Sequence, residues 1–422
     1  MPDQRSSEPS LLFTLRAVWT LLFGIGLLMV ANGLQGSLLG IRAEAEGFDP
    51  ATIGLIMSGF FVGLLAGSLW TPSAVRLVGH VRVFAAMSAI ASVSILLHAL
   101  FVDELSWWAI RCVTGFCYAG ILVVAESWLN DRAPEETRGQ ILALYMAVSF
   151  GGVAASQMLL NLASSEEATL YMLVSILISL AVVPLLLRST PLPNVESGTP
   201  ISLREVANAS PLGVFGMFIA GLANGTVFGM AAVYARSAGF SIPDTALFVA
   251  LLTIGAALLQ WPIGKLSDRF DRRIVMAFVA AFSVIASLAA TSITSIDSVY
   301  SIALIILTGG VTLSIHSLSL AYTNSYLKPE QMVGASSSLV LILGAGSVIG
   351  PIVTGTALSL FGPAGFFLWL ASCHASFVVF AIWRMRQRAS LPSDEQIPFV
   401  PSPLQGAELS TAYPEESGNT QD

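Results

Sequence analysis

Long apolar stretches separated by short polar breaks run along nearly the whole chain. A helix needs about 20 apolar residues to cross the hydrocarbon core of a bilayer. Twelve stretches have this character, at approximately residues 17–41, 51–75, 82–102, 106–130, 138–162, 168–188, 210–236, 243–264, 274–296, 298–323, 331–360 and 363–386. The pattern predicts an all-α membrane protein with twelve transmembrane helices.

The composition agrees with this prediction and excludes a soluble globule. Hydrophobic residues make up 55% of the 422 residues and charged residues only 11%, whereas soluble domains carry about 25% charged residues. Residues 1–10 and 389–422 are polar, and we expect both segments to be disordered. Because six of the 26 acidic residues lie in the C-terminal segment, the net charge of −7 says little about partners. We expect the lipid bilayer as surroundings and no nucleic-acid partner.

The basic residues indicate how the chain is oriented in the membrane. With the N-terminus inside, all but three of the 19 Lys and Arg residues fall in cytoplasmic loops or termini; the exceptions are Arg42, Arg111 and Arg236. Such a bias follows the positive-inside rule. The first apolar stretch is too long for a cleavable signal peptide and lacks a small-residue cleavage site. We therefore expect a multi-pass protein of the cell inner membrane with both termini cytoplasmic.

Several kinds of chemistry find no support in the sequence. The three cysteines, Cys112, Cys117 and Cys373, all fall in predicted spans, and an odd number there argues against disulfides or a metal centre. No ATP-binding loop of the form Gly-x4-Gly-Lys-Ser/Thr is present, which excludes a primary pump. Neither a His-Glu-x-x-His nor a Gly-x-Ser-x-Gly motif occurs, so we expect no enzyme within the membrane and no cofactor.

The chain divides into two similar halves. Residues 189–209 form the longest polar interruption and are predicted to be a cytoplasmic linker between bundles at 11–188 and 210–388. The Ala-Asn-Gly triplet at 31–33 recurs at 223–225, and the Gly-Phe pair at 47–48 recurs at 239–240. These and later matches keep an offset of 192 to 195 residues. Two parallel six-helix repeats are typical of secondary transporters, whose solute site lies near the membrane midplane between the halves.

A charged loop between two spans identifies the family that the chain resembles. Ten residues from 264 to 273 read Gly-Lys-Leu-Ser-Asp-Arg-Phe-Asp-Arg-Arg. This segment is similar to the Gly-x-Leu-x-Asp-Arg-x-Gly-Arg-Arg motif of the major facilitator superfamily, with Asp271 where glycine is usual. A first copy, between spans two and three, is eroded and lacks the acid. Over about residues 11–388 the chain resembles a transporter of this superfamily.

The resemblance implies a gating role for this motif, carried by Gly264, Asp268, Arg269, Arg272 and Arg273. Family members use the acid to latch the outward-facing state, so Asp268 is expected to meet the N-terminus of span 331–360. A carboxylate placed there gains about 0.3–1 kcal/mol from unpaired N–H groups. The alternative is that these charges only anchor the topology.

A second charged element follows the fourth span. Asp131-x-x-Pro-x-x-x-Arg138-Gly resembles an element that many superfamily members carry at this point. Its charge pair could clamp the fourth span to the fifth, although exposed ion pairs contribute only about 0–1 kcal/mol. Ordinary solvated loop charges are the alternative.

Span 106–130 contains two ionisable residues, Arg111 and Glu126. Intramembrane charges are costly and by default face a cavity and serve function. The two lie about 22 Å apart along a helix at 1.5 Å per residue, so they cannot pair directly. Arg111 begins the segment 111–115, which ends in glycine and resembles the superfamily's Arg-x-x-x-Gly element. In the superfamily this element is linked to proton coupling. We predict that Glu126 is the protonation site and that Arg111 tunes it or binds solute; simple anchoring at the membrane interface is the alternative for each.

Five further polar residues are candidates for the solute site: Asn32, Gln35, Asn224, His316 and Tyr118. Asn32, Gln35 and Asn224 lie on the spans that face the cavity in this superfamily. Both Asn residues neighbour glycines, which let helices approach closely, so interhelical hydrogen bonding is an equal alternative. A histidine titrates near neutrality, but a lone membrane histidine more often serves packing.

The combined prediction is a secondary active transporter, a monomer that moves a small organic solute across the membrane by alternating access with proton coupling. A proton-driven efflux antiporter for drugs or metabolites and a facilitative uniporter are the alternatives. The sparse charge in the spans favours a neutral, weakly charged or amphipathic solute over a polyanion. The run Glu-Ser-Trp-Leu-Asn at 126–130 is similar to a bacterial subgroup whose solutes are mostly unassigned.

Overall fold

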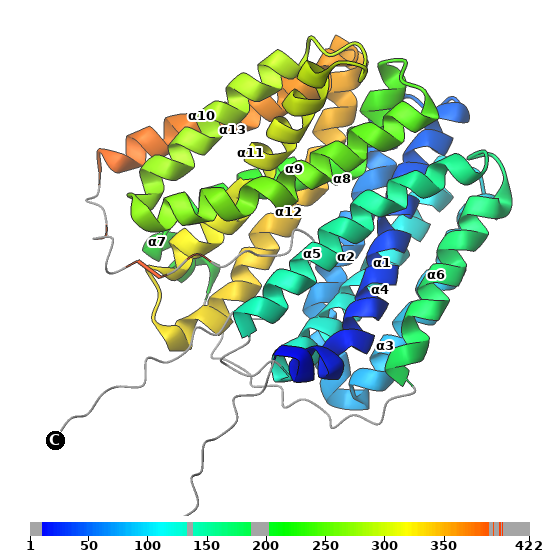
Figure 1. The fold of residues 1–422 in the computed structure, drawn as a ribbon, viewed down its shortest axis with the longest axis horizontal. Coiled ribbons are helices and arrows are strands. Elements are labelled where there is room, and N and C mark those ends of the chain that lie inside the picture. Colours follow the sequence, from blue (N-terminus) through cyan, green and yellow to red (C-terminus); the bar gives the residue numbers. More distant parts are fainter. Residues whose placement is uncertain are drawn as a thin grey trace, which may run out of the picture.

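The computed structural model describes residues 11–132, 138–186, 202–387, 391, 396, 397 and 399. The described part of the first half contains α1 (Leu11–Ala45), α2 (Pro50–Val78), α3 (His80–Leu100), α4 (Glu104–Arg132), α5 (Arg138–Ser156), the 3-10 helix η2 (Gln157–Leu162) and α6 (Ala168–Leu186). The second half contains α7 (Leu203–Ala209), α8 (Pro211–Ser237), α9 (Ile242–Arg269), α10 (Arg272–Ala290), α11 (Val299–Asn324), α12 (Pro329–Phe361) and α13 (Ala364–Met385). All twelve apolar stretches form helices, which confirms the predicted fold class (Figure 1).

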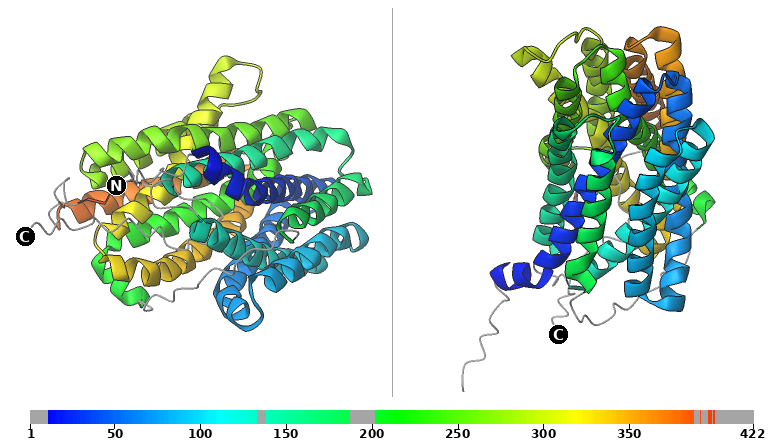
Figure 2. Two further views of the ribbon diagram at one scale, coloured as in Figure 1. Left: turned by 60° about the horizontal axis from the view of Figure 1, so that its bottom comes forward. Right: turned by 90° about the vertical axis from the view of Figure 1, so that its right-hand side faces the viewer.

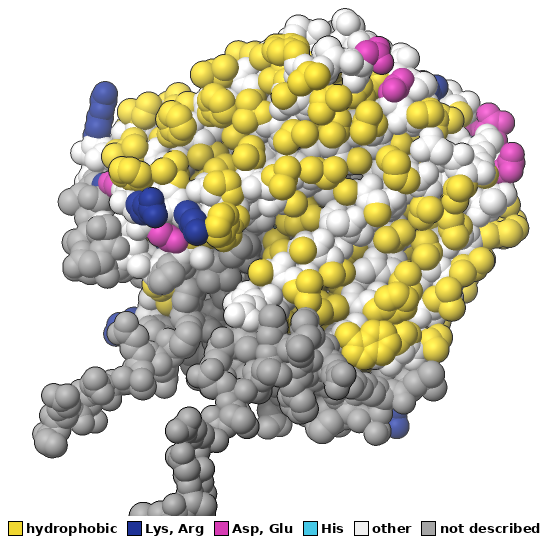
Figure 3. Space-filling model, viewed as in Figure 1, with side chains coloured by type: hydrophobic (Ala, Val, Ile, Leu, Met, Phe, Trp, Pro, Cys, Tyr) yellow, Lys and Arg dark blue, Asp and Glu magenta, His cyan; other side chains and the backbone are white. Residues whose placement is uncertain are grey.

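Within the described residues, eleven helices are long and apolar enough to cross a membrane. The twelfth apolar segment, Ala168–Pro184 of α6, is shorter. Seen from the side, the long helices run in roughly one common direction (Figure 2, right). Apolar side chains cover the visible helix faces, and the visible charged side chains lie near helix ends (Figure 3). Exposed residues such as Phe278, Ile285 and Val379 are more than half accessible, as expected for a surface that faces lipid.

The structure differs from the sequence-based prediction mainly at helix ends. The first helix runs from residue 11 to 45 rather than 17 to 41, and the predicted span 138–162 ends in the 3-10 turn η2. Part of the predicted linker folds as the short helix α7, which begins with a capping box between Ser202 and Glu205. Hydrogen bonds from the backbone and hydroxyl of Ser202 lower the pKa of Glu205. Residues 1–10 and 187–201 lie outside the described residues.

The internal repeat is visible at equivalent turns of the two halves. Gly47 and Gly239 both have a positive φ, at 81° and 84°, between the first two long helices of each half. A polar cap follows each turn: Asp49 accepts from the amide of Thr52, and Ser241 accepts from the amide of Asp244. The same local chemistry therefore starts α2 and α9.

Close helix crossings also repeat. In the first half, a Cβ on Gly63 of α2 would collide with the carbonyl of Cys112 on α4. In the second half, a Cβ on Gly255 of α9 would collide with the carbonyl of Ile306 on α11. These small residues let the helix backbones approach directly, which is how membrane helices gain packing energy without a hydrophobic drive between them.

We call the side on which α1 begins and α13 ends the terminal side, and the opposite side the distal side. The halves contact each other through α2 with α12, α5 with α9, and α1 with α8. At the distal ends of α2 and α12, a Cβ on Gly54 would collide with the carbonyl of Pro351, and one on Gly355 with that of Pro50. The halves lie together at the distal side, and their helices diverge toward the terminal side (Figure 1).

Candidate solute cavity and gates

A small cavity lies between the two halves, and helices from both line it. From the first half come residues of α1, α2, α4, α5 and η2, and from the second half residues of α8 and α9. Its lining includes Asn32, Ser37, Phe60, Arg111, Gln157, Phe228 and Val249. Its volume is about 30 Å³, which is room for one or two water molecules. The cavity in this conformation is therefore smaller than an organic solute.

The most prominent residue of this lining is Arg111, which is only 3% exposed. Its guanidinium carbon lies 4.7 Å from the centre of the Phe60 ring, a cation–π contact. Among the described residues, no hydrogen bond or ion pair reaches Arg111, and its buried Nε has no partner. Within the part of the chain that the structure describes, Arg111 interacts electrostatically with the titratable groups of Tyr118, Cys112 and His98. None of these is a carboxylate.

The amide of Gln157 joins α1 to η2 beside this cavity. The hydroxyl of Ser37 donates to Gln157 Oε1 at 2.7 Å, and Gln157 Nε2 donates to the carbonyl of Gly33 at 3.2 Å. Neither Ser37 nor Gln157 is among the residues predicted from the sequence. The signal that could have found Gln157 is the one that marked Gln35, an amide within a long apolar stretch.

The other candidates for the solute site are buried, but only some of them lie at the cavity. Asn32 lines it together with Arg111, and Tyr118 lies near it through a ring contact with Phe60 at 5.9 Å. Gln35 is 1% exposed, and neither of its amide atoms has a partner among the described residues, but it is not part of the lining. Asn224 and His316 are also buried outside the lining.

Glu126 lies farther along α4, toward the terminal side, and is buried against α5. The hydroxyl of Tyr145 donates to Glu126 Oε1 at 2.7 Å. The Glu126 residue is 9% exposed and that of Tyr145 is 3% exposed. Trp128 is buried nearby in the sequence and stacks on His80 of α3. The carboxyl group of Glu126 therefore has a fixed phenolic partner, whereas an acid that snorkels to the interface would point into water.

The distal side is closed by contacts between α1 and α8. Arg236 Nε lies 3.2 Å from Glu44 Oε2, an ion pair between the halves. Another guanidinium nitrogen of Arg236, Nη1, donates to the carbonyl of Phe240 at 2.6 Å. Within the first half, Arg42 pairs with Glu46 and donates to the carbonyl of Ser165 at 3.3 Å. Charged side chains thus hold the distal loops to one another and the two halves together.

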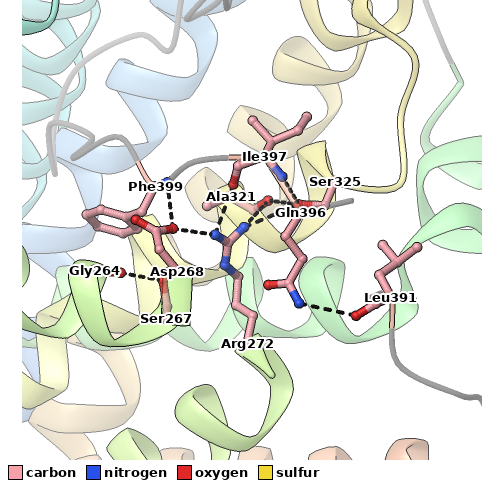
Figure 4. A network of polar contacts seen from close by, with 10 residues as sticks. All are labelled: Gly264, Ser267, Asp268, Arg272, Ala321, Ser325, Leu391, Gln396, Ile397 and Phe399. Carbon is pink, nitrogen blue, oxygen red and sulfur yellow. Dashed lines mark hydrogen bonds and ion pairs between the residues drawn. The ribbon is translucent and has the colours of Figure 1, made fainter. Parts of the chain in front are cut away.

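On the terminal side, the charged motif forms a compact cluster around Arg272, which is 1% exposed (Figure 4). Arg272 donates to Asp268 at 2.9 Å, to the carbonyl of Ala321 at 3.0 Å and to Ser325 Oγ at 3.2 Å. The buried Arg273 pairs with Asp271 at 2.8 Å, and Asp271 also caps α10 by accepting from the amide of Arg273. Asp271, which stands where the family motif usually has glycine, therefore caps α10. Arg269 is exposed at the end of α9.

Part of the C-terminal segment, predicted to be disordered, packs on this cluster. The amide of Phe399 donates to Asp268 Oδ1 at 2.8 Å, and the carbonyl of Ile397 accepts from Arg272 at 2.9 Å. The ring of Phe399 lies against Gly264, where a Cβ would overlap it. Asp268 thus contacts α10 and the tail here, rather than the N-terminus of α12. The side chains of Asp131 and Arg138 lie outside the described residues, so their expected clamp remains a prediction.

Comparisons with known proteins agree with the fold and its repeat. The family model of the Major Facilitator Superfamily matches twice, at residues 21–214 and 213–412. YcaD of Escherichia fergusonii, described as an uncharacterized MFS-type transporter, is 27% identical and covers 89% of this chain and 97% of its own length.

Two solved structures show the same fold at low sequence identity. The nucleoside transporter NupG superposes with a TM-score of 0.74 at 14% identity, covering 86% of this chain and 98% of its own. A bacterial homologue of the human lysosomal transporter Spinster, in an inward-facing conformation, has a TM-score of 0.65 at 17% identity, covering 90% and 96%. The chain belongs to the Major Facilitator Superfamily.

Proposed function

We propose that the protein is a secondary active transporter that moves a small organic solute across the cytoplasmic membrane by alternating access, with protons as the coupling ion. The observation that carries this proposal is the position of the cavity. It lies between two repeated bundles, both bundles line it, and the contacts between them concentrate on the distal side. Rocking the bundles about this point would open the cavity to one side of the membrane at a time.

The orientation of the chain gives this conformation a direction. By the positive-inside rule, the terminal side, with its loops rich in arginine and lysine, would lie in the cytoplasm. The closed distal side then faces outward, so the conformation is the inward-facing or inward-occluded one. In the outward-facing state the Asp268 cluster would close the terminal side, as the family resemblance implies. Asp131 and Arg138 would assist that closure, and the distal ion pair between Glu44 and Arg236 would open.

The coupling site proposed here is Glu126 with Tyr145. A carboxyl group buried beside a phenol at 2.7 Å can hold a proton when the site faces one compartment and lose it when the site is rehydrated. Glu126 and Arg111 lie on the same helix, so movement of α4 would affect the proton site and the solute site together. Asn32 and Tyr118 complete the solute side of this arrangement.

Transport by reconstituted protein tests the proposal. Proteoliposomes containing the purified chain and a trapped pH-sensitive dye would receive solutes one at a time, nucleosides, amino acids and carboxylates included. The expected result is a solute-dependent pH change that is absent from empty liposomes and from the Glu126→Gln variant. If an imposed pH gradient changes the solute flux neither in the parent protein nor in Glu126→Gln, proton coupling is rejected. If no solute is transported at all, the transport function is rejected.

A further inference from the structure

We propose that the solute carries a single carboxylate on an apolar body, and that Arg111 is the group that binds this carboxylate. This inference rests on the proposed function and specifies the class of its solute. The structural reason is the state of Arg111, a guanidinium that lines the cavity, is almost completely buried and has no counter-charge among the described residues.

Three acids of the first half, Glu44, Glu46 and Glu126, are already engaged or too distant to pair with Arg111. Glu126 lies 15 residues along the same helix, about 22 Å away at 1.5 Å per residue, and it accepts from Tyr145. Glu44 pairs with Arg236, and Glu46 pairs with Arg42. A buried charge that lacks a partner is strongly unfavourable. A bound anion in the cavity that Arg111 lines would supply the missing charge.

The geometry around Arg111 suits a planar carboxylate. The guanidinium carbon lies 4.7 Å from the centre of the Phe60 ring, and among the described residues no hydrogen bond occupies the guanidinium nitrogens. The planar fork of an arginine binds a carboxylate through two parallel N–H···O bonds. Asn32, Ser37 and Gln157 add polar side chains to the lining of the same cavity.

The rest of the lining limits both the charge and the polarity of the solute. Phe60, Phe61, Val153, Val227, Phe228 and Val249 surround the polar groups with apolar surface. A phosphate or dicarboxylate would place a second negative charge against these side chains without a partner. One positive charge and several apolar walls therefore fit an amphipathic monocarboxylate. The cavity is too small for such a molecule in this conformation, so binding must accompany separation of the halves.

A thermal-stability screen on the purified, full-length protein tests this inference directly. The probes are matched pairs that differ only in charge: benzoate with benzamide, hexanoate with hexanamide, and further monocarboxylates of three to ten carbons with their amides. Inorganic phosphate is added as a dianion. We expect at least one carboxylate to raise the melting temperature while its amide and phosphate do not.

Variants connect any such effect to Arg111. In Arg111→Gln the apparent affinity for the protecting carboxylate should fall roughly ten- to hundredfold, and Arg111→Lys should retain part of it. Arg76→Gln is the matched control, because Arg76 is exposed on α2 and bonds only to Ser73 among the described residues. If Arg111→Gln does not fold, the wild-type panel and Arg111→Lys still decide the question.

The outcomes separate this inference from the proposed function. A panel in which no carboxylate protects the wild type better than its amide overturns the carboxylate site, and so does full protection in Arg111→Gln. Flux of a neutral solute in proteoliposomes would leave transport standing and reject the anion. Carboxylate binding without flux of that carboxylate would leave the site standing and reject transport.

Discussion

Arg236 and Glu44 form an ion pair at 3.2 Å although 192 residues separate them. The same offset relates the repeated triplets at 31–33 and 223–225. The two residues therefore occupy equivalent positions of the two repeats and meet near the pseudo-two-fold axis between α1 and α8. About two helical turns away, a Cβ on Gly36 would lie 3.7 Å from the carbonyl oxygen of Phe228, again 192 residues on. The repeated position holds an acid in one half and a base in the other, and their ion pair joins the distal ends of the halves.

The first prediction concerns this ion pair. Glu44→Gln should shift the protein away from the state in which the distal side is closed. Because the side chains of Arg236 and Glu44 are 29% and 35% exposed, solvent screens the pair and its contribution is about 0.2–1 kcal/mol. The change in populations should then be at most about fivefold. It can be measured as faster labelling of Ser37→Cys by an impermeant maleimide from the outer side, in a background lacking the three native cysteines.

The charge-swapped pair is the control for this effect. Glu44→Arg combined with Arg236→Glu should return the labelling rate toward that of the parent, because the attraction is restored with opposite sense. If the single and the swapped variants label equally fast, the ion pair does not hold the distal side closed.

The second prediction uses glycines that pack within or between the halves. Gly54→Ala would collide with Pro351 across the two halves, and Gly63→Ala with Cys112 inside one half. Overpacking of this kind costs about 1–3 kcal/mol. Gly54→Ala should favour opening of the distal side with little loss of thermal stability. Gly63→Ala should lower the melting temperature without changing the labelling rate of the Ser37→Cys reporter. Gly151→Ala, whose Cβ would meet nothing within 4 Å, should change neither quantity.

The third prediction concerns the energy of the empty site. Arg111→Met keeps much of the side-chain volume and removes a buried charge that has no counter-charge among the described residues. Replacing buried charges by apolar groups can stabilise a protein by about 1–4 kcal/mol. The ligand-free variant should therefore melt a few degrees higher than the parent in the same detergent. A melting temperature well below that of the parent would mean that Arg111 has a structural role instead.

The fourth prediction separates the two parts of the proton site. Glu126→Gln should abolish uptake driven by a pH gradient and leave solute counterflow without a gradient intact. Tyr145→Phe removes a hydrogen bond to the carboxyl group, which contributes about 1.5–3 kcal/mol when the acceptor is charged. It should keep coupling but move the pH at which transport is half-maximal upward, since loss of the donor favours the protonated acid. An unchanged pH profile in Tyr145→Phe would show that the hydrogen bond at 2.7 Å does not tune the site.

Sequence patterns predicted much of this structure because bilayer-spanning helices leave strong signals. Apolar length alone located the helices, and the repeat at 31–33 and 223–225 located the two halves. Intramembrane charge marked Arg111, which the structure places in the cavity, and Glu126, which it buries against α5. These signals are local or depend on exact repetition.

Other features depend on which side chains meet across helices, and the sequence could not supply them. Phe60 and Val249 look like lipid-facing residues until α2 and α9 are placed beside the cavity. Asn224 and His316 carry the same signal as Asn32 but lie outside the lining. The contact between Ile397 and Arg272 joins residues 125 apart, in a segment whose composition predicts disorder.

The last prediction concerns this contact of the tail with the charged motif. Phe399 donates its amide to Asp268 at 2.8 Å, and its ring covers Gly264. Gly264→Val would therefore displace the ring, and Phe399→Ala would remove it. Either change should speed the modification of a Ser325→Cys reporter, because Ser325 Oγ lies 3.3 Å from the amide of Ile397. A chain that ends at residue 388 should reach the same rate. Phe270→Ala is the control, since Phe270 is exposed in the same loop. If the Ser325→Cys reporter reacts at the same rate in the parent, the two variants, the shortened chain and the control, the tail does not cover the motif in the membrane.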